Sequence, residues 1–129
     1  MSIKRTIRPF VLAASTLAIT STATSENWIY LGPDSNGSDY SIDQDSISSE
    51  DGRIEFWSKI DASSDSTVKY REKKTLARID CKKKRLGTIY SVIYYPNGSS
   101  ESYGPFDYAT LSPIVPGSMG EWMEEFVCS

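Results

Sequence analysis

The sequence predicts an α+β domain: an antiparallel β-sheet of about five to six strands covered by one C-terminal α-helix. Three observations lead to this fold class. Residues Ile79–Tyr95 contain the most strand-like run of the chain, with β-branched and aromatic residues on both faces. Helical spacing of apolar residues is convincing only near the C-terminus. The chain has two cysteines, Cys81 and Cys128, and a disulfide between them would tie the helix to the sheet.

Residues 1–25 show the three-part order of a secretory signal peptide, with a basic start, an apolar stretch and small polar residues. We expect cleavage after Ala23 or Ser25, which leaves residues 26–129 as one domain. The apolar stretch is too short to span a bilayer as a stable helix. The alternative, a retained N-terminal anchor, is disfavoured because the three-part pattern is complete. No other apolar run is long enough, so we expect no transmembrane segment after cleavage.

Composition excludes several classes of function. Cleavage removes three basic residues and no acid, so eleven Lys and Arg face seventeen Asp and Glu, a net charge of about −6 that argues against nucleic acid as a partner. The chain contains no histidine, which excludes Ser-His-Asp and Cys-His nucleophile systems. It also lacks a glycine-rich phosphate loop. We therefore expect a protein that is not an enzyme and needs no cofactor.

The first half of the domain is predicted to form three strands. Asn27–Leu31 is the first and ends at Gly32-Pro33, and Tyr40–Ile47 is at most a short second strand. Asp51-Gly52 is typical of a hairpin turn and leads into the third strand, Arg53–Ile60. Its alternation places Ile54, Phe56 and Ile60 on one face and Glu55, Trp57 and Lys59 on the other.

The next predicted strand, Thr67–Cys81, changes parity midway, because Val68, Tyr70 and Leu76 share one parity whereas Ala77 and Ile79 share the other. A one-residue slip moves every side chain to the opposite face, so a β-bulge near Leu76 would restore the pattern.

A further strand, Leu86–Tyr95, follows a basic turn. Pro96-Asn97-Gly98 is the strongest hairpin signal in the chain and predicts a returning strand at Ser99–Tyr103. The segment Gly104–Pro116 contains three prolines and is expected to be irregular.

The C-terminal helix is predicted to start at Ser118, which with Glu121 forms a capping-box pattern. Glu121, Glu124 and Glu125 are expected to face solvent, with Trp122 as the buried anchor of the opposite face. The apolar stripe that should pack on the sheet consists of Met119, Trp122, Met123, Phe126 and Val127.

The two cysteines permit one intramolecular disulfide, Cys81–Cys128. A small exported domain gains stability from such a link, and an oxidising compartment allows it to form. The alternative, two free thiols, is expected of a cytosolic protein.

The candidate binding residues are basic and form the run Lys82–Arg85 (Lys82, Lys83, Lys84 and Arg85). Such a run can capture sulfated glycans, anionic lipid headgroups or an acidic patch of a protein. The alternative is a solvated turn that keeps the end of the sheet soluble. Three residues of the neighbouring strand, Arg71, Lys73 and Lys74, are expected to extend the patch.

An acidic segment near the N-terminal strands could be mistaken for a calcium loop. It contains Asp34, Asn36, Ser38, Asp43 and Asp45, but its glycine and its last acid do not match the calcium-loop spacing. We interpret it as turn chemistry and expect no metal site.

Residues scattered along the whole predicted domain resemble the surface-adhesin protein E family of bacterial exported proteins. They are Trp28-Ile29-Tyr30, Tyr40, Asp43, Ser46, Ile47, Gly52, Trp57, Ile79-Asp80-Cys81 with its basic follow-on, Tyr94-Tyr95, Ile114, Pro116-Gly117-Ser118 and Val127-Cys128. The resemblance implies an antiparallel sheet, a C-terminal helix and a disulfide that joins the two.

For function, the resemblance implies a binding domain, possible partners being host matrix proteins such as laminin or vitronectin. No cysteine stands at the predicted cleavage site, so we expect no lipid anchor. The alternative is therefore a soluble periplasmic accessory protein that binds an envelope protein. Both interpretations place the protein outside the cytoplasm, in the periplasm, in the medium or on the cell surface. The sequence does not indicate whether the protein is a monomer or a dimer.

Overall fold

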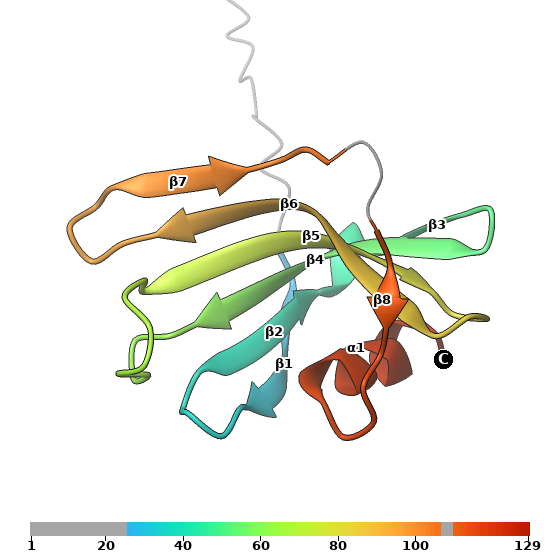
Figure 1. Cartoon of the computed structure of the whole chain (residues 1–129), viewed down its shortest axis with the longest axis horizontal. Coiled ribbons are helices and arrows are strands. Elements are labelled where there is room, and N and C mark those ends of the chain that lie inside the picture. Colours follow the sequence, from blue (N-terminus) through green and yellow to red (C-terminus); the bar gives the residue numbers. More distant parts are fainter. Residues whose placement is uncertain (1–25, 107–109) are drawn as a thin grey trace, which may run out of the picture.

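The computed structural model describes residues 26–106 and 110–129, and the predicted signal peptide lies outside them. In the described residues, one antiparallel sheet of eight strands is covered on one face by a single α-helix (Figure 1). The predicted α+β class is confirmed. The strands are β1 Trp28–Pro33, β2 Asp39–Asp43, β3 Ser48–Glu50, β4 Arg53–Asp61, β5 Glu72–Asp80, β6 Arg85–Tyr94, β7 Ser100–Tyr103 and β8 Ser112–Pro113. The 3-10 helix η1 spans Gln44–Ser46, and the helix α1 spans Met119–Val127.

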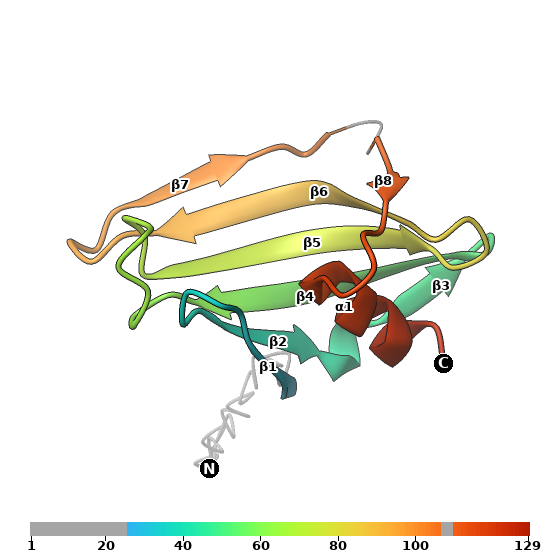
Figure 2. The same ribbon diagram turned by 60° about the horizontal axis from the view of Figure 1, so that its bottom comes forward.

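The main strands follow the spatial order β1-β2-β4-β5-β6-β7, and β3 and β8 pair with β4 and β6 respectively. The helix α1 crosses the sheet at one end (Figure 2). We call the opposite side of the sheet, which α1 does not cover, the open face.

The hydrophobic core lies between the sheet and α1. Ile42, Phe56 and Ile79 are completely buried, and they come from β2, β4 and β5. Phe56 lies opposite Ala77 in the neighbouring strand, so the two side chains share the helix-facing side of the sheet. Met123 of α1 packs against these residues from the helix side of the sheet. The predicted alternation of the third strand is confirmed.

The helix docks through four of the five residues of the predicted stripe, since Met119 and Phe126 also pack against the core, but the predicted anchor is wrong. Met123 and Val127 are buried, whereas Trp122 is 43% exposed and is not the buried anchor. Its ring lies over Gly32 at the edge of the sheet, where a Cβ atom would come within 2.7 Å of the ring. Trp122 sits at the margin of the apolar stripe, so the narrower side chain of Met123 occupies the centre.

The predicted capping box is also wrong in detail. Ser118 is the N-cap residue, but its hydroxyl donates to the Val115 carbonyl instead of accepting from the helix. The Glu121 carboxylate accepts from the Gly117 N–H at 3.2 Å, one residue earlier than a capping box requires. Glu124 is not a solvated residue either, because its side chain is only 13% exposed and pairs with Lys84.

The predicted β-bulge is present next to Leu76, but the extra residue is in the partner strand. Leu76 pairs with Tyr90 and Ala77 with Thr88, so Ile89 of β6 has no partner in this register. As a result Leu86 packs on the core, whereas Tyr90 lies on the open face. The predicted strand Thr67–Cys81 is too long, because β5 begins at Glu72 and the preceding Thr67–Arg71 forms a loop. The alternation of Val68 and Tyr70 therefore does not indicate a strand.

The predicted disulfide is confirmed. Cys81 and Cys128 are bonded with Cα atoms 5.8 Å apart. Cys81 directly follows β5, and Cys128 is the C-cap residue of α1. The bond therefore fastens the last turn of the helix to the end of the sheet.

A buried carboxylate joins two loops at the other end of the sheet. Asp65 is 6% exposed and accepts hydrogen bonds from the Ser38 hydroxyl at 2.6 Å and from the Thr67 N–H at 2.9 Å. These hydrogen bonds lower the pKa of the Asp65 carboxyl. The bond from Ser38 has the largest effect, followed by the two bonds from Thr67.

These bonds make stability depend on pH. Because the pKa in the folded state is below that in the unfolded state, Asp65 stabilises the protein above the usual aspartate pKa of about 3.9, and this contribution is lost as pH falls through the lower folded pKa. We expect Asp65→Asn to lower the melting temperature at about pH 7 and to flatten its decline on acidification. Thermal melts of both proteins across the acid range measure this. An identical acid decline in both proteins would contradict the assignment.

Candidate binding surface at the end of the sheet

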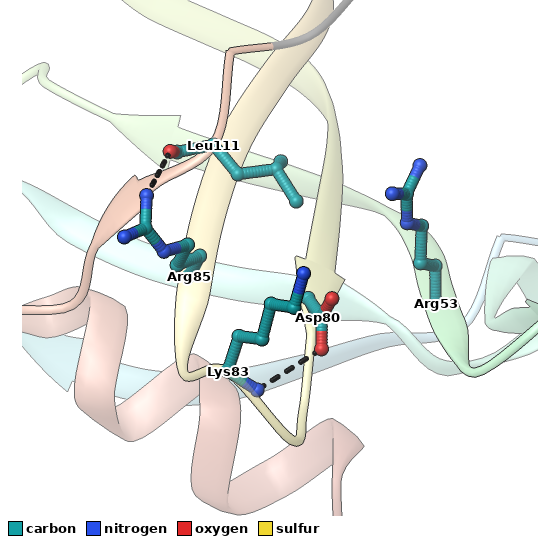
Figure 3. Close-up of a pocket in the computed structure, with 5 residues that line it drawn as sticks. All are labelled: Arg53, Asp80, Lys83, Arg85 and Leu111. Carbon is teal, nitrogen blue, oxygen red and sulfur yellow. Dashed lines mark hydrogen bonds between the residues drawn. The ribbon is translucent and has the colours of Figure 1, made fainter.

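A hollow with a volume of ≈ 620 Å³ lies at the end of the sheet where β5 turns into β6. Figure 3 shows the five residues that line it, and we call their site the basic hollow. They come from β4, β5, the β5–β6 turn, β6 and the segment before β8, and they are Arg53, Asp80, Lys83, Arg85 and Leu111.

Strand register brings these residues together. Asp80 lies directly between Arg53 of β4 and Arg85 of β6. Directly opposed residues of antiparallel strands share a face, so the three side chains form a row across the open face. Lys83 reaches this row from the turn, and in the view of Figure 3 its ammonium lies between the two guanidinium groups.

The shape of the turn depends on Asp80. Its Oδ1 accepts from the N–H groups of Lys82 at 3.1 Å and Lys83 at 3.0 Å. Lys84 has a φ of 53°, a left-handed conformation that closes the turn before β6 begins. The Asp80 carboxylate therefore serves the backbone, and the basic side chains around it are placed by that backbone.

The basic hollow carries an excess of positive charge. Its three cations face one carboxylate, and among the described residues none of the three forms an ion pair. One donor of Arg85, Nη1, reaches the Leu111 carbonyl at 3.3 Å, which orients the guanidinium. Arg53 and Lys83 are exposed. An Arg fork presents several N–H donors and binds carboxylate, sulfate or phosphate groups in a bidentate manner.

The four residues of the predicted basic run have different surroundings. Lys83 and Arg85 line the basic hollow, and Lys82 is exposed beside it. Lys84 turns towards the helix, where its ammonium lies 3.3 Å from Glu124. This ion pair partly neutralises Lys84 and leaves Lys83 and Arg85 as the stronger candidates.

The other three predicted residues do not extend this patch. Lys73 and Lys74 lie at the start of β5, and Arg71 precedes it, whereas the basic hollow lies at the end of the strand. The six steps from Lys74 to Asp80 span roughly 20 Å. Lys74 is also paired with Glu72 at 3.8 Å and with Glu26 at 3.9 Å.

Arg53 is a site residue that the sequence did not indicate. It stands alone after the Asp51-Gly52 turn, about thirty positions before Arg85, and only the register of β4 with β5 brings it into the row. The predicted Asp51-Gly52 turn marks the start of the third strand. Pairing that strand with the one that ends at Asp80 would have placed Arg53 beside Asp80.

The acidic segment forms a turn. Asp34 Oδ1 accepts from the N–H groups of Asn36 at 2.9 Å and Ser38 at 3.0 Å, as an aspartate does in a tight turn. In the described parts of the chain, no group of three His, Cys, Asp or Glu residues is arranged to hold a metal ion. The helix found in residues 26–106 and 110–129 is too short to cross a membrane.

Comparison with known proteins gives one match. The family described as surface-adhesin protein E matches residues 28–129, which include all the strands and the helix. No curated protein and no solved structure matches the chain.

Proposed function

Since this chain belongs to the surface-adhesin protein E family, we propose that it is a non-enzymatic exported domain that captures a protein partner through the basic hollow. The observation that carries the proposal is the row of Arg53, Asp80 and Arg85, completed by Lys83. The partner feature that fits this row is an acidic segment, because carboxylates match the guanidinium fork.

The scaffold supports binding more than catalysis. The cations stand on strand ends and on a turn held by the disulfide and by Asp80, so the backbone that carries them is preorganised. Three cations in an open hollow attract anions over a distance of about 8 Å at physiological ionic strength.

Two partner classes fit this chemistry. One is a host extracellular-matrix protein such as laminin or vitronectin, and it requires display on the cell surface. The other is a protein of the bacterial envelope, and it requires a soluble periplasmic location. Protease accessibility on intact cells supports the first, and recovery in an osmotic-shock fraction supports the second.

Reversal of two charges tests the proposed site. We expect the double change Lys83→Glu with Arg85→Glu to weaken capture of immobilised laminin, vitronectin or envelope extract by about tenfold or more, because attraction becomes repulsion. Surface binding measured at several salt concentrations gives the affinity, which should fall with added salt for the wild type.

The matched control is Lys69→Glu with Arg71→Glu. Both residues are exposed and lie before β5, at the far end of that strand, and the change in net charge is the same. We expect this control to keep most of the wild-type affinity. Equal losses in the two variants would show that only overall charge matters, and full affinity in the first variant would exclude the basic hollow.

A further inference from the structure

A second hollow on the open face differs in chemistry from the basic hollow. It has a volume of ≈ 250 Å³, and we call it the aromatic pocket. It lies over the middle strands of the sheet. There Trp57 of β4 is opposite Leu76 of β5, and Lys74 of β5 is opposite Val92 of β6. Its walls are apolar and its rim is charged, and its residues are Glu26, Trp28, Asp43, Trp57, Lys74, Val92 and Tyr94.

Both indole rings of the aromatic pocket are held in place. The Trp28 Nε1–H donates to Glu26 at 2.9 Å, and the Lys59 ammonium lies 4.5 Å from the centre of the Trp28 ring. Trp57 meets Tyr90 edge to face, with ring centres 6.2 Å apart and an interplanar angle of 82°. A ligand would therefore meet two preformed aromatic surfaces.

The charged rim is almost neutral. The Lys74 ammonium lies 3.9 Å from Glu26 and 5.9 Å from the centre of the Tyr94 ring. Asp43 accepts from the Asn27 N–H through Oδ1 at 2.9 Å. The hydrogen bond from Trp28 lowers the pKa of the Glu26 carboxyl, and the nearby ammonium of Lys74 lowers it further. Glu26 therefore stays ionised and acts as a hydrogen-bond acceptor.

From these contacts we propose that the aromatic pocket binds one ring of a neutral saccharide. The C–H face of a sugar packs on Trp57 and Trp28, and its hydroxyl or amide groups donate to Glu26 and Asp43 and accept from Lys74. A volume just below the usual range for drug-sized ligands suits a single ring.

Other occupants fit less well. An apolar side chain of a partner protein would cover Glu26, Asp43 and Lys74 without giving them hydrogen bonds, which costs free energy for each buried polar group. A sulfated ring would lose the hydration of its anionic groups without a net positive charge to compensate, because the carboxylates of Glu26 and Asp43 balance the ammonium groups of Lys74 and Lys59. This site uses no residue of the basic hollow, so the inference does not depend on the proposed function.

Tryptophan fluorescence provides a direct test. The chain has three tryptophans, and Trp122 lies on the helix side, so a Trp122→Phe background leaves only the two pocket indoles as reporters. Two probes separate the possible sources of the sugar: a β-1,4-linked N-acetylglucosamine oligomer of bacterial-wall type, and a neutral N-glycan of host type. A heparin-derived disaccharide serves as the anionic comparison.

We expect a saturable fluorescence change with at least one of the neutral probes and none with the heparin disaccharide. In the same background, Trp57→Ala should weaken binding by about tenfold or more, measured by calorimetry and by the remaining Trp28 signal. Asp43→Asn and Lys74→Ala should each weaken it to a smaller degree, and these rim changes carry the test if Trp57→Ala does not fold.

Three results would overturn the inference: no saturable change with either neutral probe, binding of the heparin disaccharide alone, or unchanged affinity in the Trp57→Ala and rim variants. The Lys83→Glu, Arg85→Glu protein should bind the neutral probe as the wild type does, because it leaves the aromatic pocket intact. Saccharide binding and protein capture can therefore fail separately.

Discussion

Replacement of Cys128 by serine is expected to lower the free energy of unfolding by about 4 kcal/mol. The disulfide joins residues 47 positions apart, and in the chain-entropy model a loop of that length restricts the unfolded state by this amount. Small domains have a total stability of about 5–15 kcal/mol, so the loss is a large share of it.

Chemical unfolding with and without reductant measures this effect. Reductant should lower the midpoint of the wild type and leave the Cys128→Ser protein unchanged. The double variant Cys81→Ser with Cys128→Ser controls for any effect of a single free thiol. A wild type whose midpoint does not respond to full reduction of Cys81 and Cys128 would contradict the prediction.

The disulfide also links stability to the basic hollow. Cys81 directly follows Asp80, and Lys84, at the end of the same turn, pairs with Glu124 of the helix. The turn that carries Lys83 is thus fastened to α1 at both ends. Helix docking and the placement of the basic side chains therefore depend on the same contacts, which is why a binding variant needs its own measurement of folding.

Long alternating patterns predicted the fold well. The third predicted strand places Phe56 in the core and Trp57 on the open face, as its alternation indicates. The short strands β3 and β8 were not predicted, because residues such as Ser48 and Ser112 are exposed and show no alternation. Such strands depend on pairing with a neighbour and leave little trace in the sequence.

The candidate sites were harder to predict, because they depend on register. Lys83 and Arg85 were found as neighbours in the sequence, but Arg53 enters the basic hollow only through strand pairing. Lys74 was grouped with the basic run, although the length of β5 separates them. It belongs to the aromatic pocket, where Trp28 and Trp57 also meet from different strands.

The bulge shows why parity alone could not place these side chains. The sequence located an irregularity near Leu76, and the register shift is there, but Ile89 of the partner strand is the extra residue. An inserted residue shifts parity only in the strand that carries it, so this bulge changes the alternation of β6 and leaves that of β5 regular. The parity change expected within Thr67–Cys81 came from residues before Glu72, which form a loop.

Met123→Ala is expected to cost about 2–5 kcal/mol of stability, whereas Trp122→Ala should cost less. Met123 is 8% exposed and packs in the same core cluster as Phe56 and Ile79, so its removal leaves a cavity. Trp122 is 43% exposed at the edge of the sheet, where water can fill the vacated space. Alanine is the best helix former, so neither change weakens the helix itself.

Urea unfolding of the wild type and of the two variants gives the loss of unfolding free energy for each change. The larger loss identifies the residue that anchors α1. The order of the two losses is more informative than either value, because both changes remove a large side chain from adjacent positions of one helix. A larger loss for Trp122→Ala would mean that α1 is rotated so that its indole, rather than Met123, faces Phe56. In that case the contact of Trp122 with Gly32 could not exist, and Gly32→Ala, which should destabilise the observed structure, would lose the steric part of its effect.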